Sequence, residues 1–157
     1  MLGKVTHKPL YGNLLAGKPF TVNYAMGWTG DIFGENDVLG ADPTTFGLTN
    51  GKRGNNASYT PWSSFAIVEG KDLEFIVNLD KPTEVSKVIF GSLFNPAMRM
   101  LPAGGIAVEV SADGQQYTQI AEKTLKHDCP ETGRIAFTDS IEFEPAQATF
   151  LKRSEER

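Results

Sequence analysis

The chain has 157 residues, of which 40% are apolar and 22% charged, and this is the composition of one ordinary globular domain rather than of a disordered segment. Its formal net charge of -4 gives no basic footprint for nucleic acid, and no apolar run is long enough to form a transmembrane helix. The single cysteine excludes a disulfide framework and a thiolate metal cluster within the chain.

The N-terminal part begins with a predicted lead-in over residues 1–17, where proline and glycine interrupt any apolar period. It contains no apolar signal-peptide core, so the residues themselves predict no export signal. Phe20, Val22 and Tyr24 then alternate with polar residues, which predicts a first strand. The irregular segment from Met26 to Pro43 predicts a long loop, and loops of that length are typically functional or mobile.

The central stretch of the chain runs from Leu48 to Leu79. A glycine-containing turn at Leu48 to Gly54 is followed by an aromatic loop at Tyr59 to Phe65. From Leu73 to Leu79, apolar residues then alternate with polar ones, which predicts a strand with one buried face.

The C-terminal half reads as a series of short strands separated by turns. A turn at Asp80 to Thr83 and a hairpin turn at Asp113-Gly114 are predicted from their glycine, proline and aspartate residues. The predicted strands are Val85 to Leu93, Ile106 to Ser111, Tyr117 to Ala121, Arg134 to Thr138, Ser140 to Glu144 and Gln147 to Lys152. No window shows a helical stripe, so the pattern favours an all-β sandwich, with residues 153–157 expected to form a charged tail.

An ordered set of motifs gives the chain a resemblance to a known family, over about Phe20 to Phe150. The motifs are Leu48 to Gly54, Trp62 with Phe65, the strand Leu73 to Leu79 with Lys81-Pro82, Val88 to Phe90, and Val108 to Tyr117. Together they resemble the discoidin-like domains, also called coagulation factor 5/8 type C domains, of the galactose-binding-like superfamily. The accessory modules of bacterial glycoside hydrolases such as β-hexosaminidases are the most similar in style.

This resemblance implies an eight-stranded antiparallel β-sandwich, a jelly roll, over residues 18–152. It further implies a non-catalytic carbohydrate-binding module of a larger glycoside hydrolase, which binds terminal galactose or N-acetylhexosamine sugars through loops at one end. The implied partners are a glycan and the parent enzyme's catalytic domain. The implied location is secreted, periplasmic or cell-surface.

The resemblance places the sugar site in end loops, where aromatic rings pack on a pyranose and polar groups bind its hydroxyls. Arg99 and Asn95 are the expected hydrogen-bonding residues. Trp62 is a candidate ring, although its position in the family is commonly part of the core. Trp28 and Phe33 are candidates for sugar contact or for anchoring their own loop.

A structural calcium ion is the cofactor that the family implies, because a tight turn directs carbonyl oxygens inward. Asn50 occupies the family's aspartate position, so one negative charge is lost and the affinity is expected to fall. The other reading of Asn50-Gly51 is a simple turn that favours positive φ. The remaining candidate ligands are the carbonyls near Phe46 and Arg53, the side chain of Asn55, and Glu142 or Glu144.

Two other functions stay open. One is a structural module that packs against a catalytic domain and binds nothing alone. The other is an adhesion module for protein or lipid surfaces, which is disfavoured because the loops are expected to lack paired apolar side chains beside basic residues. Catalysis is not predicted, since no nucleophile motif, phosphate loop or zinc signature occurs, although counting cannot exclude a pair of catalytic carboxylates. His7 and His127 are expected at the surface, and Cys129 as a buried or inert thiol.

Overall fold

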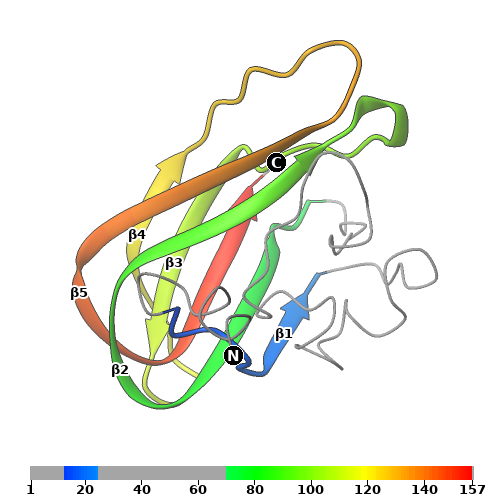
Figure 1. The fold of residues 1–157 in the computed structure, drawn as a ribbon. Helices are drawn as coiled ribbons and strands as arrows, with labels where there is room; N and C mark the ends of the chain where they lie inside the picture. Colours follow the sequence, from blue (N-terminus) through cyan, green and yellow to red (C-terminus); the bar gives the residue numbers. More distant parts are fainter. Residues whose placement is uncertain (1–12, 25–69, 157) are drawn as a thin grey trace, which may run out of the picture.

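The computed structural model describes residues 13–24 and 70–156, which form an antiparallel sheet of five strands in the order β1-β2-β5-β3-β4 (Figure 1). The elements are β1 Phe20–Asn23, β2 Leu73–Phe94, the 3-10 turn η1 Pro96–Met98, β3 Gly105–Ser111, β4 Thr118–Thr124 and β5 Ile135–Glu156. Within these two ranges there is no α-helix, which confirms the predicted all-β class. None of the described residues form a helix with the length and hydropathy needed to cross a membrane.

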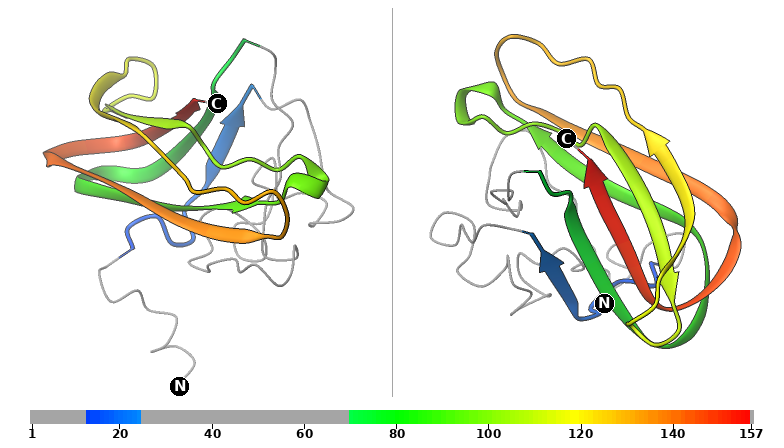
Figure 2. Two further views of the ribbon diagram at one scale, coloured as in Figure 1. Left: turned by 90° about the horizontal axis from the view of Figure 1, so that it is seen from above. Right: turned by 180° about the vertical axis from the view of Figure 1, so that it is seen from behind.

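Both layers of the sandwich are built from β2 and β5, which pair with each other from Leu73↔Glu155 to Phe94↔Ile135. The first half of β2 and the second half of β5 lie in the middle of the sheet, between β1 and β3. Their other halves curve away together and fold back over the sheet (Figures 1 and 2). One bent pair of strands therefore contributes to both faces that enclose the core.

The bend arises from two bulges, one in each strand, where that strand has more residues than its partner. Leu79 to Pro82 of β2 lie opposite Thr149 alone, and Phe143 to Pro145 of β5 lie opposite Ser86 alone. Bulges of this kind bend a strand and increase its twist without ending it, and Pro145 has no N–H to donate to a ladder. The pair of strands therefore turns over here while its pairing continues on either side.

Polar contacts hold the first bulge in shape. Asp80 adopts a φ of 70°, and its N–H donates to Asn78 Oδ1 at 2.9 Å. The Asp80 carboxylate also forms an ion pair with Lys18 Nζ at 2.9 Å, and the Asn78 N–H donates to the Pro19 carbonyl at 3.1 Å. The segment before β1 is thus attached to the bend.

The hydrophobic core lies between the layers and draws on both halves of the bent strands. Each large apolar side chain that leaves water contributes roughly 1.5–3 kcal/mol. From the sheet come Phe20, Val77, Leu79, Ile106, Val108 and Leu151, and from the folded-back halves come Val85, Val88, Phe90 and Ile141. The alternation predicted for Leu73 to Leu79 is confirmed, since Leu73, Phe75, Val77 and Leu79 are all buried.

The predicted hairpin turn between β3 and β4 is present, and a network of hydrogen bonds stabilises it. Asp113 Oδ1 accepts from the N–H groups of Gln115 at 2.8 Å and Gln116 at 3.0 Å, and from the Ser111 hydroxyl at 3.0 Å. These bonds lower the pKa of Asp113, with Gln116 the largest contributor. Gly114 adopts a φ of 76°, and a Cβ there would lie 3.1 Å from the Phe150 ring.

Two predictions about strand boundaries are wrong. The turn at Asp80 to Thr83 is a bulge inside β2, and the three strands expected between Arg134 and Lys152 form one continuous strand. The predicted charged tail is also contradicted, because β5 continues to Glu156 and pairs there with Gly105 of β3. A bulge leaves the same polar sequence pattern as a turn, so the sequence alone does not separate them.

Arg153 explains why the charged end of β5 stays ordered in the sheet. It follows Leu151 on the inward face, and its guanidinium carbon lies 4.3 Å from the Phe75 ring centroid and 4.5 Å from that of Phe90. Arg153 Nη2 also lies 2.7 Å from the buried carboxylate of Glu155. Stacking on two rings and pairing with a carboxylate make an arginine acceptable between the layers.

Replacing Gly114 by alanine is expected to lower the free energy of unfolding by about 2 kcal/mol, because positive φ and the close Phe150 ring both disfavour a Cβ. The matched control is Gly70→Ala, which has a φ of 72° but no atom of the described residues within 4 Å of the added Cβ, so it should cost only about 1 kcal/mol. Urea denaturation measures both values. Equal losses would contradict a role for the Phe150 contact.

Candidate functional site

Among the described residues, the best candidates for a site lie in the loop after β2. Two backbone hydrogen bonds close this loop at its base. The N–H of Asn95 donates to the Met100 carbonyl at 2.9 Å, and the N–H of Met100 donates back to the Asn95 carbonyl at 3.0 Å. Pro96 begins the η1 turn, where its fixed φ is already suitable. These bonds make a short, rigid projection at the end of β2.

Arg99 stands at the tip of this loop in a conformation that is unfavourable for arginine. Its φ of 57° and ψ of 31° are left-handed, and its N–H donates to the Pro96 carbonyl at 3.1 Å. For a residue with a Cβ, this conformation costs about 1–2 kcal/mol. The side chain is exposed, and no described carboxylate forms an ion pair with it. Strain of this kind is concentrated at functional sites.

Apolar side chains flank Arg99. Met98 is 45% exposed and Leu101 is 55% exposed, so the loop presents apolar side chains before and after Arg99 in the sequence. The expectation that the loops lack paired apolar side chains next to a basic residue is therefore wrong for this loop. The loop therefore combines an exposed donor fork with two exposed apolar side chains.

The structure separates the two polar candidates of this loop. Arg99 lies at the exposed tip, whereas Asn95 is only 4% exposed at the base. Asn95 thus positions the loop through its backbone bonds to Met100. The candidate rings Trp28, Phe33 and Trp62 lie outside the described residues.

The metal-site candidates are only partly within the described chain. Glu142 and Glu144 are exposed on β5, and Glu142 Oε1 lies 2.9 Å from Lys87 Nζ. The hydrogen bond from Lys87 lowers the pKa of Glu142. No group of three or more His, Cys, Asp or Glu residues that could hold a metal occurs in residues 13–24 and 70–156. The other candidate ligands, Phe46, Asn50, Arg53 and Asn55, lie outside those ranges.

The structure differs from the expectations for two single residues, His127 and Cys129. His127 is not a surface residue, since its side chain is 7% exposed, its Nε2 lies 2.8 Å from Asp139 Oδ2 and its ring packs on Phe137. Cys129 is exposed, so the first of its two expected states, a buried thiol, is wrong, and the second, an inert thiol, stays a prediction. The sequence gives no sign of the contact between His127 and Asp139, because it joins the connection after β4 to a residue near the start of β5, and no local pattern indicates that these two segments meet. That contact anchors the connection to the folded-back half of the sandwich.

No family model matches the chain, and no curated protein matches it. Solved structures do resemble it. The module CpGH89CBM32-5 from Clostridium perfringens, solved in complex with GalNAc-β-1,3-galactose, shares 17% identity and a TM-score of 0.51 over 90% of this chain and 85% of that module. Chitosan-binding module 2 of a chitosanase/glucanase from Paenibacillus sp. IK-5, in complex with chitotriose, shares 17% identity and a TM-score of 0.52 over 91% and 86%.

Chitosan-binding module 1 of the same enzyme gives a TM-score of 0.53 at 17% identity, over 91% of this chain and 86% of that module. The chain therefore has the galactose-binding-like β-sandwich fold that these modules share. This agrees with the fold that the sequence motifs imply.

Arg99→Gly is expected to raise the free energy of unfolding by about 1 kcal/mol, because glycine adopts a positive φ without the Cβ clash. Arg99→Ala, which keeps the Cβ, should change it by less than about 0.5 kcal/mol. Urea denaturation of both variants measures the difference. A loss of more than about 1 kcal/mol in Arg99→Gly would show that the guanidinium stabilises the fold.

Proposed function

We propose that this chain is a non-catalytic carbohydrate-binding module with a discoidin-like β-sandwich, and that it serves as an accessory domain of a larger glycoside hydrolase. The structural neighbours support the class, because CpGH89CBM32-5 and the chitosan-binding module 2 were each solved with a bound glycan. The proposal assigns the chain terminal galactose or N-acetylhexosamine sugars as ligands. It also places the module outside the cytoplasm, where such glycans are found.

The observation that carries the proposal is Arg99, which is held exposed and strained at the tip of a rigid loop. A fixed backbone reduces the entropy that binding would otherwise cost. The guanidinium presents donors in a planar fork, which suits two neighbouring hydroxyl groups of a sugar. Arg99 is therefore the residue to which we assign hydroxyl recognition.

Apolar contact is the second element of the proposed site. Met98 and Leu101 lie beside Arg99 with about half of their surface exposed. Their alkyl groups are suited to the C–H face of a pyranose, which is a role that aromatic rings also fill. Trp28, Phe33 and Trp62 remain candidate rings for the same ligand.

A second candidate function rests on the same apolar pair. Exposed Met98 and Leu101 beside a cationic side chain also suit insertion into an anionic lipid surface. That function predicts binding to phosphatidylserine vesicles that is lost in a Met98→Ser, Leu101→Ser variant. Sugar binding without vesicle binding would reject it.

The proposal includes a structural calcium ion near the Asn50 turn, where the carboxylate of Glu144 would be a ligand. Carboxylate, amide and carbonyl oxygens are the donors that calcium prefers. Glu142 is a weaker candidate, because one of its oxygens is paired with Lys87. Bound calcium would neutralise local negative charge and hold the surrounding loops together.

Arg99→Ala and Arg99→Lys are both expected to weaken binding of GalNAc-β-1,3-galactose by about tenfold or more, because lysine keeps the charge but not the planar fork. Isothermal titration calorimetry measures the affinities. The matched control is Lys126→Ala, which removes an exposed cation outside the loop and should leave binding unchanged. Binding that survives in Arg99→Ala would remove this residue from the site, and a folded chain that binds no glycan on a broad array would reject the proposal.

Calcium is expected to raise the melting temperature of the chain, and Asn50→Asp should increase this effect because it restores one negative charge. Glu144→Gln should reduce it. Thermal unfolding in calcium and in chelator provides the comparison, with magnesium as the control ion. A melting temperature that is the same in calcium and in chelator, for both the wild type and Asn50→Asp, would exclude a structural calcium ion.

A further inference from the structure

The outer face of the sheet, opposite the core, carries a continuous row of side chains across the described strands. Strand registers align Asn23 of β1, Glu74 of β2, Ser154 of β5, Ala107 of β3 and Glu122 of β4. Side chains alternate between faces along a strand, so these residues all lie on the side away from Val77 and Val108. The row crosses the sheet at right angles to its strands.

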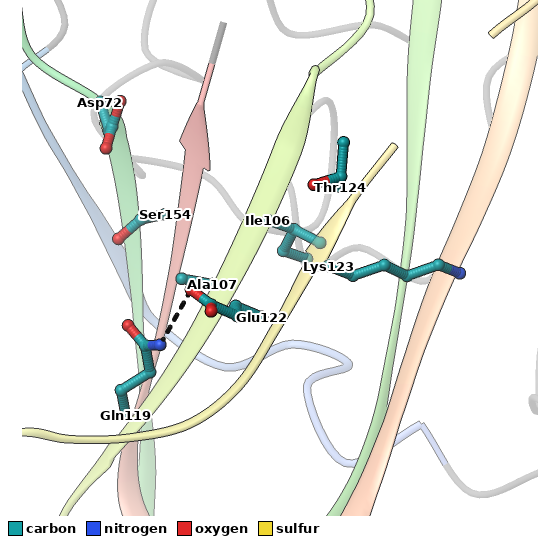
Figure 3. Close-up of a pocket in the computed structure, with 8 residues that line it drawn as sticks. All are labelled: Asp72, Ile106, Ala107, Gln119, Glu122, Lys123, Thr124 and Ser154. Atoms are coloured by element: carbon teal, nitrogen blue, oxygen red, sulfur yellow. Dashed lines mark hydrogen bonds between the residues drawn. The ribbon is translucent and has the colours of Figure 1, made fainter. Parts of the chain in front are cut away.

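The middle of this row is hollow because its residues are small. Ser154 and Ala107 lie between longer side chains, and the surface there forms a trough of about 480 Å³ (Figure 3). We define the trough by its polar and small lining residues, which are Asp72, Ala107, Gln119, Glu122, Thr124 and Ser154. A volume of this size is within the range of small-ligand sites.

One side of the trough is a ridge formed by the neighbouring register row. Lys152 Nζ lies 2.9 Å from Glu109 Oε2, 3.7 Å from Glu74 Oε1 and 4.5 Å from the Tyr117 ring centroid. Burial acts to lower the pKa of Lys152, but the hydrogen bond to Glu109 and the charge of Glu74 outweigh it, so the pKa is raised. The ammonium is therefore shared by two carboxylates, and the ridge keeps an excess of negative charge.

The trough itself is also acidic. Among the described residues, no cationic side chain pairs with Asp72 or Glu122. Lys123 lines the trough but its ammonium points away, where it donates to the Ser140 carbonyl at 3.0 Å (Figure 3). Register explains this direction, because Lys123 is opposite the inward-facing Ile106. Negative charge in the trough is thus left uncompensated.

We propose that the trough is a second glycan-contact surface and that it binds a chain of cationic amino sugars across the strands. Carboxylates at Asp72 and Glu122 match the ammonium groups of such a chain by charge. The hydroxyls of Ser154 and Thr124 and the amide oxygen of Gln119 match its hydroxyl groups, while the amide nitrogen of Gln119 donates to Glu122 Oε2 at 3.3 Å (Figure 3). That the ligand is a glycan rests on the proposed function, and that the glycan is an amino sugar follows from the negative charge of the trough.

The dimensions of the trough favour an extended chain over a single sugar. Its residues come from β5, β3 and β4 and from Asp72 directly before β2, so it spans three strand spacings, or about 14 Å. The carboxylates of Asp72, directly before β2, and Glu122 of β4 lie at opposite ends of the row. Two separated anionic groups suit a ligand that repeats its ammonium group. The loop of Arg99 is not part of this surface.

The test uses the full chain and a β-1,4-linked glucosamine oligomer, with the N-acetylated oligomer of equal length as the uncharged probe. Mildly acidic pH keeps the amines charged while exposed carboxylates stay ionised. Isothermal titration calorimetry at low and high salt measures the affinity. We expect the glucosamine oligomer to bind more tightly than its N-acetylated counterpart, and to weaken as salt rises.

Two variants remove the trough in different ways. The pair Asp72→Asn, Glu122→Gln should weaken binding of the glucosamine oligomer by about tenfold or more. Ala107→Lys fills the hollow and adds a positive charge, and should abolish binding. The matched controls are Glu84→Gln and Glu131→Gln, which remove exposed carboxylates elsewhere and should change the affinity by less than about twofold. Circular dichroism confirms that each variant is folded.

Loss of binding in both trough variants, with binding kept in Glu84→Gln and Glu131→Gln, would support the proposal. Binding that survives in the trough variants, or that is absent from the folded wild type, would overturn it. Equal binding of an oligolysine peptide would also overturn it, because the surface would then select positive charge rather than a sugar. Binding of neutral galactosides through Arg99 is measured separately, so failure of the trough leaves the proposed function standing.

Discussion

The structure depends on the pairing of β2 and β5 through a shared bend. Each strand carries extra residues where the other does not, Leu79 to Pro82 on β2 and Phe143 to Pro145 on β5, so the pair turns over without ending its ladder. The two layers are consequently joined by backbone hydrogen bonds as well as by core packing. The same bend directs the far end of β2, and with it the loop that carries Arg99, away from the rest of the sheet.

Side chains alternate between the two faces of β5, so neighbouring residues of this strand have different roles. Leu151, Arg153 and Glu155 face the core side, where the arginine stacks between Phe75 and Phe90. Lys152 and Ser154 face outward, where they form the ridge and the floor of the trough. The charged end of the strand thus combines an interior ion pair with a polar outer surface, and a shift of register by one residue would exchange the two.

Much of the fold was predictable, because strong local signals were present. The alternation of Leu73 to Leu79 and the Asp113-Gly114 turn need only local chemistry, and both are confirmed. The bulge at Asp80 was not predictable, since its sequence resembles that of a turn. The position of Arg153 between the layers was not predictable either, since it depends on aromatic rings that are distant in sequence. At the candidate site, Arg99 was named from the family resemblance, but its strained backbone and the exposed Met98 and Leu101 appear only in three dimensions. The trough needs the register of four strands, which no local pattern contains.

The central claim is that the end loop after β2 binds a sugar. Nuclear magnetic resonance of the isotopically labelled chain, titrated with GalNAc-β-1,3-galactose, tests it most directly because each backbone amide reports separately. The account predicts saturable shift changes concentrated at Asn95 to Leu101, with the core strands unchanged. A folded chain whose spectrum does not respond, or responds only away from this loop, would contradict it.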